Sequence, residues 1–434
     1  MKIRSCLGGV LFFSFVSLVS LNAAAHTLTI DEVIELSLKH SPDIDSSRFD
    51  FEGALQRTKA AEGFYLPSVD LSANAGKQYN GFKSSASNNM DLLVGTLGAS
   101  QLLYDFGKTS GLIGSAKEEA LAYQAQMQQI ISDKIYMVKK AYYDVLKAKS
   151  IIEVQRKNVN LQKQQLRRAQ RYLASGIKTI IDVSDAQVRV EQAKLDLENA
   201  KYDLELKRAV LEEEMGYMPY NGNYTLYSKK LPLPNLSRGL PGMQRSLGEL
   251  ESFAYTHRYA LEGSAHIINS AQSSVRTSKG DYYPTLSVGA NYTAQHVDES
   301  VALMQPERQG QVALQMNWNL FSGYQTDAKV QEAKIAVLKA SSQLQTVKLA
   351  IKRQVIDAYI EVRRNRKNVD LSESIAKASL KKLDQAQKRY ENDLSDYIEL
   401  QDAQQGYIVS LSNLVTAYYD YYIALAQLDH AIGR

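Results

Sequence analysis

The chain has 434 residues, and 51 Lys and Arg stand against 47 Asp and Glu, so its formal net charge is only +4. This near balance argues against nucleic acid as a partner, because phosphate binding favours a strongly basic surface. The length is sufficient for two or more domains.

The first 25 residues are typical of a secretory signal peptide. Lys2 and Arg4 form a positive start, and an apolar stretch runs from Leu7 to Val19. The single cysteine, Cys6, precedes this stretch, whereas a lipoprotein cysteine would follow it. We therefore expect cleavage after Ala25 and no lipid at the mature N-terminus. No later run of about 18 apolar residues follows, which predicts a periplasmic, secreted or outer-membrane β-barrel protein.

A short amphipathic helix is expected next, roughly over 29–62, followed by strands over 66–76 and 92–103. The polar stretch 80–90 between the strands is expected to be a surface loop. Strands of about ten residues with one apolar face match those that cross a bilayer.

A very long helix follows the strands, since no Gly or Pro occurs from Ser115 to Ser175. About 65 helical residues would reach roughly 100 Å, which exceeds a globular domain. Apolar residues recur every seven positions, as at Val145, Ile152 and Val159. This period predicts helices that supercoil against each other. The break at Ala174-Ser175-Gly176 turns the chain back, which predicts an antiparallel coiled-coil hairpin.

The second half of the chain repeats the first with a shift of 217 residues, which pairs Glu32 with Glu249, His40 with His257, Pro67 with Pro284 and Gly216 with Gly433. One local adjustment is expected, matching Phe106-Gly107 with Ser322-Gly323.

The repeat divides the chain into a signal peptide (1–25), a first repeat (26–216), a linker (217–245) and a second repeat (246–434). The linker carries four of the eight prolines. The second repeat is expected to contain a helix at 246–280, strands at 284–295 and 311–320 around a polar loop at 297–307, and a second long hairpin.

Four membrane strands per chain cannot close a barrel, and an open sheet edge is not tolerated in lipid. Oligomerisation is therefore expected. Three chains would supply twelve strands and twelve long helices. The predicted fold is mainly α with membrane β: a trimer with a twelve-stranded barrel continued by a coiled-coil tube.

Leu103-Tyr104-Asp105-Phe106-Gly107 and Leu320-Phe321-Ser322-Gly323 end the second strand of each repeat. Together with the order of elements, the repeat and the signal, they make the mature chain resemble the TolC family of outer-membrane efflux proteins. The resemblance implies a homotrimer in outer-membrane lipid with a periplasmic tunnel. Its partners would be a periplasmic membrane-fusion adaptor and an inner-membrane transporter, in an efflux pump or type I secretion system. Such proteins export small molecules or polypeptides and need no cofactor; the sequence does not identify the cargo.

Two acidic pairs follow the two helix breaks, Asp182 with Asp185 and Glu399 with Asp402. A spacing of three puts each pair on one helix face. The resemblance implies that Glu399 and Asp402 form acidic rings at the periplasmic mouth, with Asp182 and Asp185 nearby. Carboxylates also favour a helix start through capping and the helix dipole, and this alternative is preferred for Asp182 and Asp185.

The family's lock between hairpins uses a basic residue four positions before the second-repeat acid, and Ser395 stands there in this chain. The family's tyrosine is kept as Tyr390. A lock must therefore use other partners, and Lys178 and Arg389 are the candidates.

The two turns resemble the tips at which adaptors dock in the family. Ser175, Gly176 and Ile177 match the small-Gly-aliphatic tip, and Asp393 and Leu394 stand at the second tip. Alternatively both are only turns, for which Asn and Asp serve nearly as well as Gly.

Other protein classes fit the sequence less well. We find no nucleophile elbow, phosphate loop or metal cluster, so no enzyme is predicted. A periplasmic coiled-coil adaptor would carry one hairpin flanked by small β-domains. A trimeric structural surface protein would show one heptad stalk without a 217-residue repeat. The paired His40 and His257 are expected to be helix-end contacts.

Overall fold

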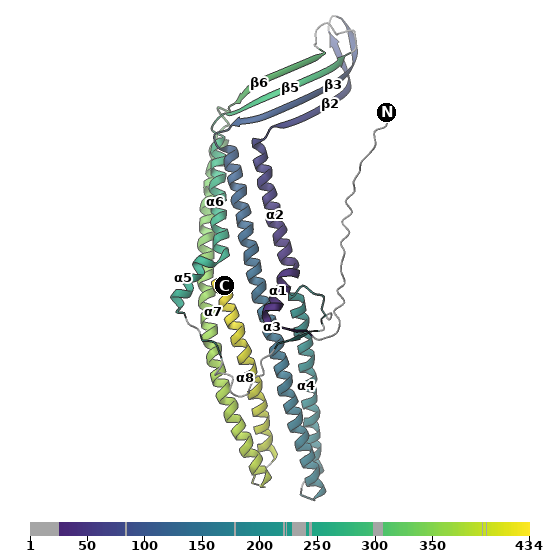
Figure 1. Ribbon diagram of the computed structural model, residues 1–434, viewed down its shortest axis with the longest axis vertical. Coiled ribbons are helices and arrows are strands. Elements are labelled where there is room, and N and C mark those ends of the chain that lie inside the picture. The colour runs from purple at the N-terminus through teal and green to yellow at the C-terminus, as the bar shows by residue number, and fades with distance from the viewer. Residues whose placement is uncertain are drawn as a thin grey trace.

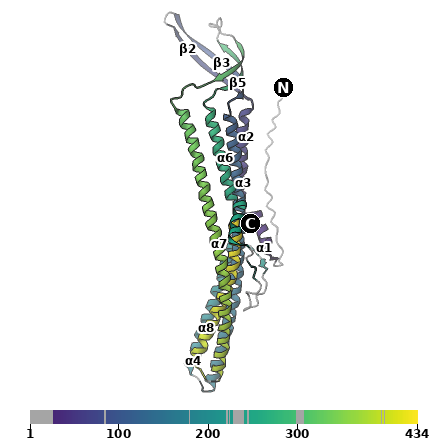
Figure 2. The same ribbon diagram turned by 90° about the vertical axis from the view of Figure 1, so that its left-hand side faces the viewer.

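The computed structural model describes residues 26–82, 85–177, 179–219, 222, 224–227, 240–242, 245–297, 307–392, 394–395 and 397–434. The predicted signal peptide lies outside these residues. A sheet forms one end of an elongated molecule, and long helices run away from it to two hairpin tips at the other end (Figure 1, Figure 2).

The sheet has four antiparallel strands in the order β2-β3-β5-β6. Their bounds are β2 (Ser68–Phe82), β3 (Ser85–Tyr104), β5 (Thr285–Val297) and β6 (Arg308–Asn317). Each repeat contributes one hairpin, and β3 pairs with β5 between the repeats. The sheet therefore ends at β2 on one side and at β6 on the other.

The surface loop predicted at 80–90 is wrong. The ladder continues through Asn80, which pairs with Asn88, to Phe82, which pairs with Ser85. Backbone hydrogen bonds hold antiparallel strands together and do not require apolar side chains, so a polar stretch can extend the hairpin. Most of the loop predicted at 297–307 lies outside the described residues.

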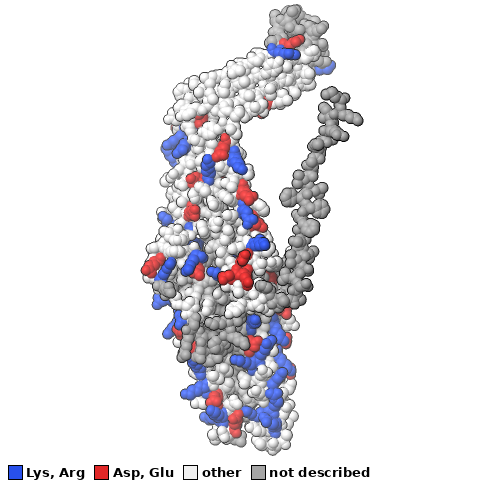
Figure 3. Space-filling model, in the orientation of Figure 1, with Lys and Arg blue, Asp and Glu red and all other residues white. Residues whose placement is uncertain are grey.

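The sheet has one apolar and one polar face. Val69, Ala99, Ala290 and Val312 form one row across all four strands. The row made by Asp70, Gly98, Asn291 and Gln311 lies on the opposite face, because neighbouring residues along a strand alternate. Leu71 and Val312 are 78% and 76% exposed. In Figure 3 the sheet is a broad white band above the charged helices.

Each repeat begins with two helices where one was predicted. These are α1 (Ile30–His40) and α2 (Pro42–Glu62) in the first repeat, and α5 (Leu247–His257) and α6 (Tyr259–Gly280) in the second. The joints, Ser41 and Arg258, are both extended. Pro42 disfavours a helical conformation at Ser41. Arg258 is buried, and its guanidinium donates to the carbonyl oxygen of His430 at 2.9 Å.

The predicted long hairpins are confirmed. Their bounds are α3 (Lys108–Ala174) with α4 (Ile180–Glu214), and α7 (Gln325–Glu391) with α8 (Tyr397–Ile432). The outgoing helices α3 and α7 have 67 residues each. The predicted seven-residue seam is buried in α3 at Val145, Ile152 and Val159. Of the helices in the described ranges, none combines the length and hydropathy that crossing a membrane requires.

The helices form a single curved layer. Near the sheet, α2 packs on α3, α3 on α6 and α6 on α7. Near the tips, α4 packs on α3, α3 on α8 and α8 on α7. Hence α2 and α4 lie along one lateral edge of the molecule and α7 along the other (Figure 1).

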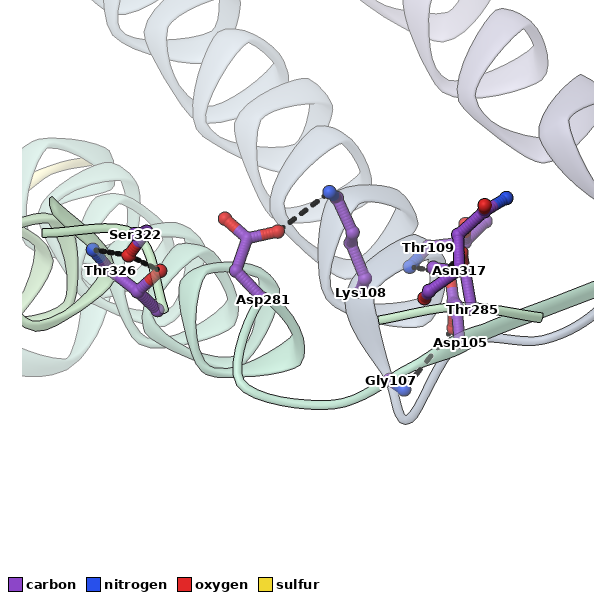
Figure 4. A network of polar contacts seen from close by, with 9 residues as sticks. All are labelled: Asp105, Gly107, Lys108, Thr109, Asp281, Thr285, Asn317, Ser322 and Thr326. Atoms are coloured by element: carbon purple, nitrogen blue, oxygen red, sulfur yellow. Dashed lines mark hydrogen bonds and ion pairs between the residues drawn. The ribbon is translucent and has the colours of Figure 1, made fainter. Parts of the chain in front are cut away.

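The junctions between sheet and helices follow the repeat (Figure 4). Asp105 accepts a hydrogen bond from the backbone N–H of Thr109 at 2.7 Å, and Ser322 accepts one from Thr326 at 3.3 Å. The first junction has positive φ at Phe106 and Gly107, and the second at Gly323 and Tyr324. The local adjustment of the repeat is therefore wrong. The shift of 217 holds, and glycine stands at the other of two left-handed positions.

The middle of the molecule ties the linker to the helices. Two short parallel strands, β1 (His26–Leu28) and β4 (Tyr224–Leu226), pair there. Tyr142 donates to the carbonyl oxygen of Tyr227 at 2.8 Å, and Tyr421 donates to that of Pro241. The paired histidines are helix-end contacts, as expected: the ring Nδ1 of His40 lies 2.9 Å from the carbonyl oxygen of Leu36.

Candidate functional site at the hairpin tips

The first tip is a tight turn built on a glycine. The N–H of Ile177 donates to the carbonyl oxygen of Tyr172 at 2.9 Å, and that of Gly176 to Leu173 at 3.0 Å. This Schellman geometry requires a left-handed residue, and Gly176 has φ 72°. Ile177 is 57% exposed, so the turn presents an aliphatic side chain to solvent.

Asp182 caps the returning helix α4. Its Oδ2 accepts hydrogen bonds from the N–H and the hydroxyl of Thr179, both at 2.9 Å. Thr179 and Asp182 thus form a capping box. Asp185 lies one turn further along and is exposed. The geometry supports the capping alternative for Asp182, and both carboxylates lie at one end of α4.

The second tip is held by side chains of its own hairpin. Arg389 Nη2 donates to the carbonyl oxygen of Leu394 at 3.2 Å, and Arg389 Nε lies 3.5 Å from Glu399 Oε1. Asn392 Nδ2 donates to the carbonyl oxygen of Lys388 at 2.7 Å. Leu394 is 68% exposed. Arg389 therefore pairs with the second-repeat acid Glu399 inside one hairpin, and not between hairpins.

Asp402 lies on α8 one turn beyond Glu399 and is exposed. It forms no ion pair in the described part of the chain. The spacing of three thus presents two carboxylates near the start of α8, and only Glu399 has a basic partner beside it.

The contact between the two hairpins uses residues that the sequence did not indicate. Arg168 of α3 donates to Glu391 Oε1 of α7 at 2.9 Å. Tyr172 lies with its ring centroid 6.3 Å from that of Tyr390. Arg168 and Glu391 are not equivalent under the repeat, so the 217-residue shift gave no signal for them.

Tyr390 lies in a small apolar cluster near the tips, made by Leu383, Ala386, Tyr390, Leu400 and Ala403. It is buried, with 6% of its surface exposed. Burial raises the pKa of Tyr390, and the neighbouring Tyr172, Tyr397 and Asp182 raise it further, although Arg168 opposes them. The residue predicted as a gate contact is therefore an uncharged packing residue where the two hairpins meet.

The remaining predicted residues, Lys178 and Asp393, lie outside the described residues. Those that are described fall at the two tips, with the acidic pairs at the starts of α4 and α8. Within the described ranges, no group of three or more His, Cys, Asp or Glu is placed to hold a metal ion.

Solved structures share this arrangement. The outer membrane protein VceC from Vibrio cholerae superposes with a TM-score of 0.78 at 17% identity, covering 93% of this chain and 96% of that one. The Campylobacter jejuni CmeC outer membrane channel gives a TM-score of 0.80 at 14% identity, covering 93% and 85%. The open state of the Neisseria gonorrhoeae MtrE outer membrane channel gives 0.74 at 18%, covering 93% and 88%. These likenesses establish the fold.

Sequence comparison reaches the same family. The chain is 27% identical to the outer membrane protein TolC of Vibrio cholerae serotype O1 over 180 residues, which span 41% of this chain and 40% of that relative's length. The profile of a family described as outer membrane efflux protein matches residues 33–216 and 253–434, one segment in each repeat. The chain therefore belongs to the outer membrane efflux protein family, whose members are transport proteins and resemble TolC.

Proposed function

We propose that this protein is the outer-membrane channel of a tripartite efflux pump or a type I secretion system, and that it exports small molecules or polypeptides. It acts as a homotrimer with a twelve-stranded barrel and a periplasmic helical tunnel. The chain performs no chemistry and binds no cofactor. The signal peptide is cleaved and the mature N-terminus is not lipidated.

The observation that carries this proposal is the four-stranded sheet at the end of the two hairpins. Its apolar face suits lipid and its polar face suits a water-filled lumen. The sheet ends at β2 and β6, whose outer backbone groups need partners in a bilayer. Pairing β2 of one copy with β6 of another satisfies them, and three copies make a barrel of twelve strands.

The hairpin tips form the periplasmic mouth in this proposal. Glu399 and Asp402 face the pore, with Asp182 and Asp185 nearby, and the exposure of Asp402 supports a pore-facing position. Tyr390, Arg389 and Lys178 are the gate contacts. Six carboxylates from Glu399 and Asp402 would surround one axis in a trimer and attract cations.

An adaptor joined to an inner-membrane transporter docks at the tips. The exposed Ile177 and Leu394, one at each tip, support such an apolar contact. Two hairpins in each chain speak against the alternatives of a periplasmic adaptor and a trimeric surface stalk.

Tag accessibility tests the orientation. A tag inserted beside Ser85, at the end of the sheet far from the helices, is expected to react with antibody on intact cells. A tag at Gly176 should react only after the outer membrane is permeabilised. Labelling at Gly176 on intact cells would overturn the orientation and with it the channel.

A further inference from the structure

The two lateral edges of the protomer carry opposite charge. Along one edge, α2 and α4 together hold 15 acidic and 8 basic residues. Along the other edge, α7 holds 15 basic and 8 acidic residues. The edges thus differ in sign with net charges of −7 and +7, although the whole chain is near neutrality.

The outward face of α4 has the pattern of a helix that packs against another helix. Apolar residues recur on it every seven positions: Ile181, Val188, Leu195 and Tyr202, all between 54% and 68% exposed. The opposite face, with Ala186, Val190 and Ala193, is buried against α3. A second seven-residue row is as sustained as the first, so α4 has two packing faces and the single chain covers one.

An acidic row runs beside the exposed apolar row of α4. Glu191, Glu198 and Glu205 each lie three positions after one of its members, which makes them neighbours on the helix surface. Glu191 and Glu198 pair only with lysines on α4 itself, Lys194 and Lys201. Glu205 forms no ion pair in the described part of the chain.

The outward face of α7 is basic at matching places. Its buried seam recurs at Val355, Val362, Val369 and Ala376. Lys367 and Lys381 lie on the opposite side of the helix, are exposed, and form no ion pair in the described ranges. Leu371 and Ile375 lie between them and are 51% and 57% exposed.

The charged and apolar residues of the two edges lie at equal heights above the tips. Glu191 is 12 residues after Thr179 and Lys381 is 11 residues before Asn392, so each lies about 17 Å up its helix. Leu195 and Ile375 correspond in the same way at 16 and 17 residues. Glu205 and Lys367 follow at 26 and 25 residues, roughly 38 Å above the tips.

We propose that α4 of one copy packs along α7 of a second copy, with Glu191 facing Lys381, Glu205 facing Lys367 and Leu195 facing Ile375. Rotation about an axis parallel to the helices keeps every residue at its height, so this register closes a head-to-tail ring. Opposite charges attract in this order, whereas contacts between two α4 edges or two α7 edges are repelled. The inference rests on the homotrimer proposed above and identifies what orders its chains.

Charge reversal of the purified full chain in detergent tests the pairing. Glu191→Lys with Glu205→Lys turns six attractive pairs per trimer into repulsive ones, and so does Lys367→Glu with Lys381→Glu. Each double variant is expected to shift the trimer–monomer equilibrium toward monomer by about tenfold or more, measured by light scattering on a sizing column. The variant that carries all four changes should recover the trimer, and high salt should narrow the differences.

A matched control changes the charge by the same amount away from the edges. Glu153→Lys with Glu262→Lys, on α3 and α6, should leave the trimer unchanged. Circular dichroism of each variant separates loss of assembly from loss of folding. Double variants as trimeric as the unmodified chain, or a fourfold variant that stays monomeric while helical, would overturn the pairing and leave the channel proposal standing. An unmodified chain that is monomeric would overturn both.

Discussion

The carbonyl oxygen of His40 lies 2.3 Å from the position that a Cβ on Gly216 would occupy. The second repeat contains the same relationship, in which the carbonyl oxygen of His257 lies 2.7 Å from a Cβ placed on Gly433. Both glycines end a long returning helix with a left-handed φ, 76° and 81°. The end of α1 or α5 thus packs directly on the backbone of a glycine, and this contact fixes the joint at Ser41 or Arg258.

Replacing these glycines should destabilise the fold. We expect Gly216→Ala to cost about 2 kcal/mol or more, because a left-handed alanine alone costs roughly 1–2 kcal/mol and His40 leaves no room for its Cβ. Gly433→Ala should cost less, because its contact is longer. The midpoint of thermal unfolding measures the effect. Gly406→Ala, inside α8 with nothing within 4 Å of the new Cβ, is the control and should be neutral or stabilising.

Neutralising the acids at the start of α8 should alter ion selectivity. In planar-bilayer recordings, Glu399→Gln with Asp402→Asn should lower cation preference and weaken block by divalent cations, because the charge of the ring is lost. The trimer should persist, since each helix-start carboxylate is worth only about 0.3–1 kcal/mol.

Asp185→Asn is the appropriate control for this change, because Asp182 caps α4 and its loss would also disturb the turn. A smaller effect is expected from the control. Unchanged selectivity and block in the Glu399/Asp402 variant would mean that these acids only begin a helix.

The ion pair between the hairpins should hold the tips together. Arg168→Ala is expected to loosen the contact by up to about 1 kcal/mol, since the pair with Glu391 is partly exposed. The mouth should then open more often, seen as larger or more frequent conductance steps and faster proteolysis at the tips. Arg156→Ala is the matched control, because its partner Glu153 lies on the same helix. Equal behaviour of the two variants would argue against a lock at Arg168.

The ion pair between Asp144 and Lys147 should make stability depend on acid pH. Burial opposes ionisation of Asp144, but the hydrogen bond and charge of Lys147, with the charge of Lys140, outweigh it and hold the pKa of Asp144 below its usual 3.8. Because the pKa is lower in the folded chain, the pair stabilises the fold above pH 3.8, and this contribution is lost as the pH falls through the folded-state pKa.

Asp144→Asn should therefore cost roughly 1–2 kcal/mol at neutral pH, the usual worth of a hydrogen bond between charged groups. The difference from the unmodified chain should shrink in denaturant titrations at acid pH. Asp203→Asn, an exposed carboxylate on α4 without an ion pair in the described ranges, should change stability at neither pH. A deficit in Asp144→Asn that is independent of pH would contradict this account.

The sequence alone determined the elements with a regular period. The heptad of Val145, Ile152 and Val159 and the absence of Gly and Pro predicted the 67-residue helix α3, and the repeat carried that prediction to α7. Alternation along 284–295 predicted β5 within two residues of its ends. Such patterns are readable because every turn of a long helix, and every second residue of a half-buried strand, meets the same environment.

Tertiary structure decided what depends on segments that are far apart in the chain. The hairpin of β2 and β3 extends through the polar stretch 80–90 because each strand offers the other a backbone ladder. The joint at Arg258 depends on carbonyl groups at the end of α8, 172 residues away. Arg168 meets Glu391 only because α3 packs beside the second hairpin, a contact that neither periodicity nor repeat encodes. A single buried pair follows from the packing of whole helices, so its partners leave no local pattern in the sequence.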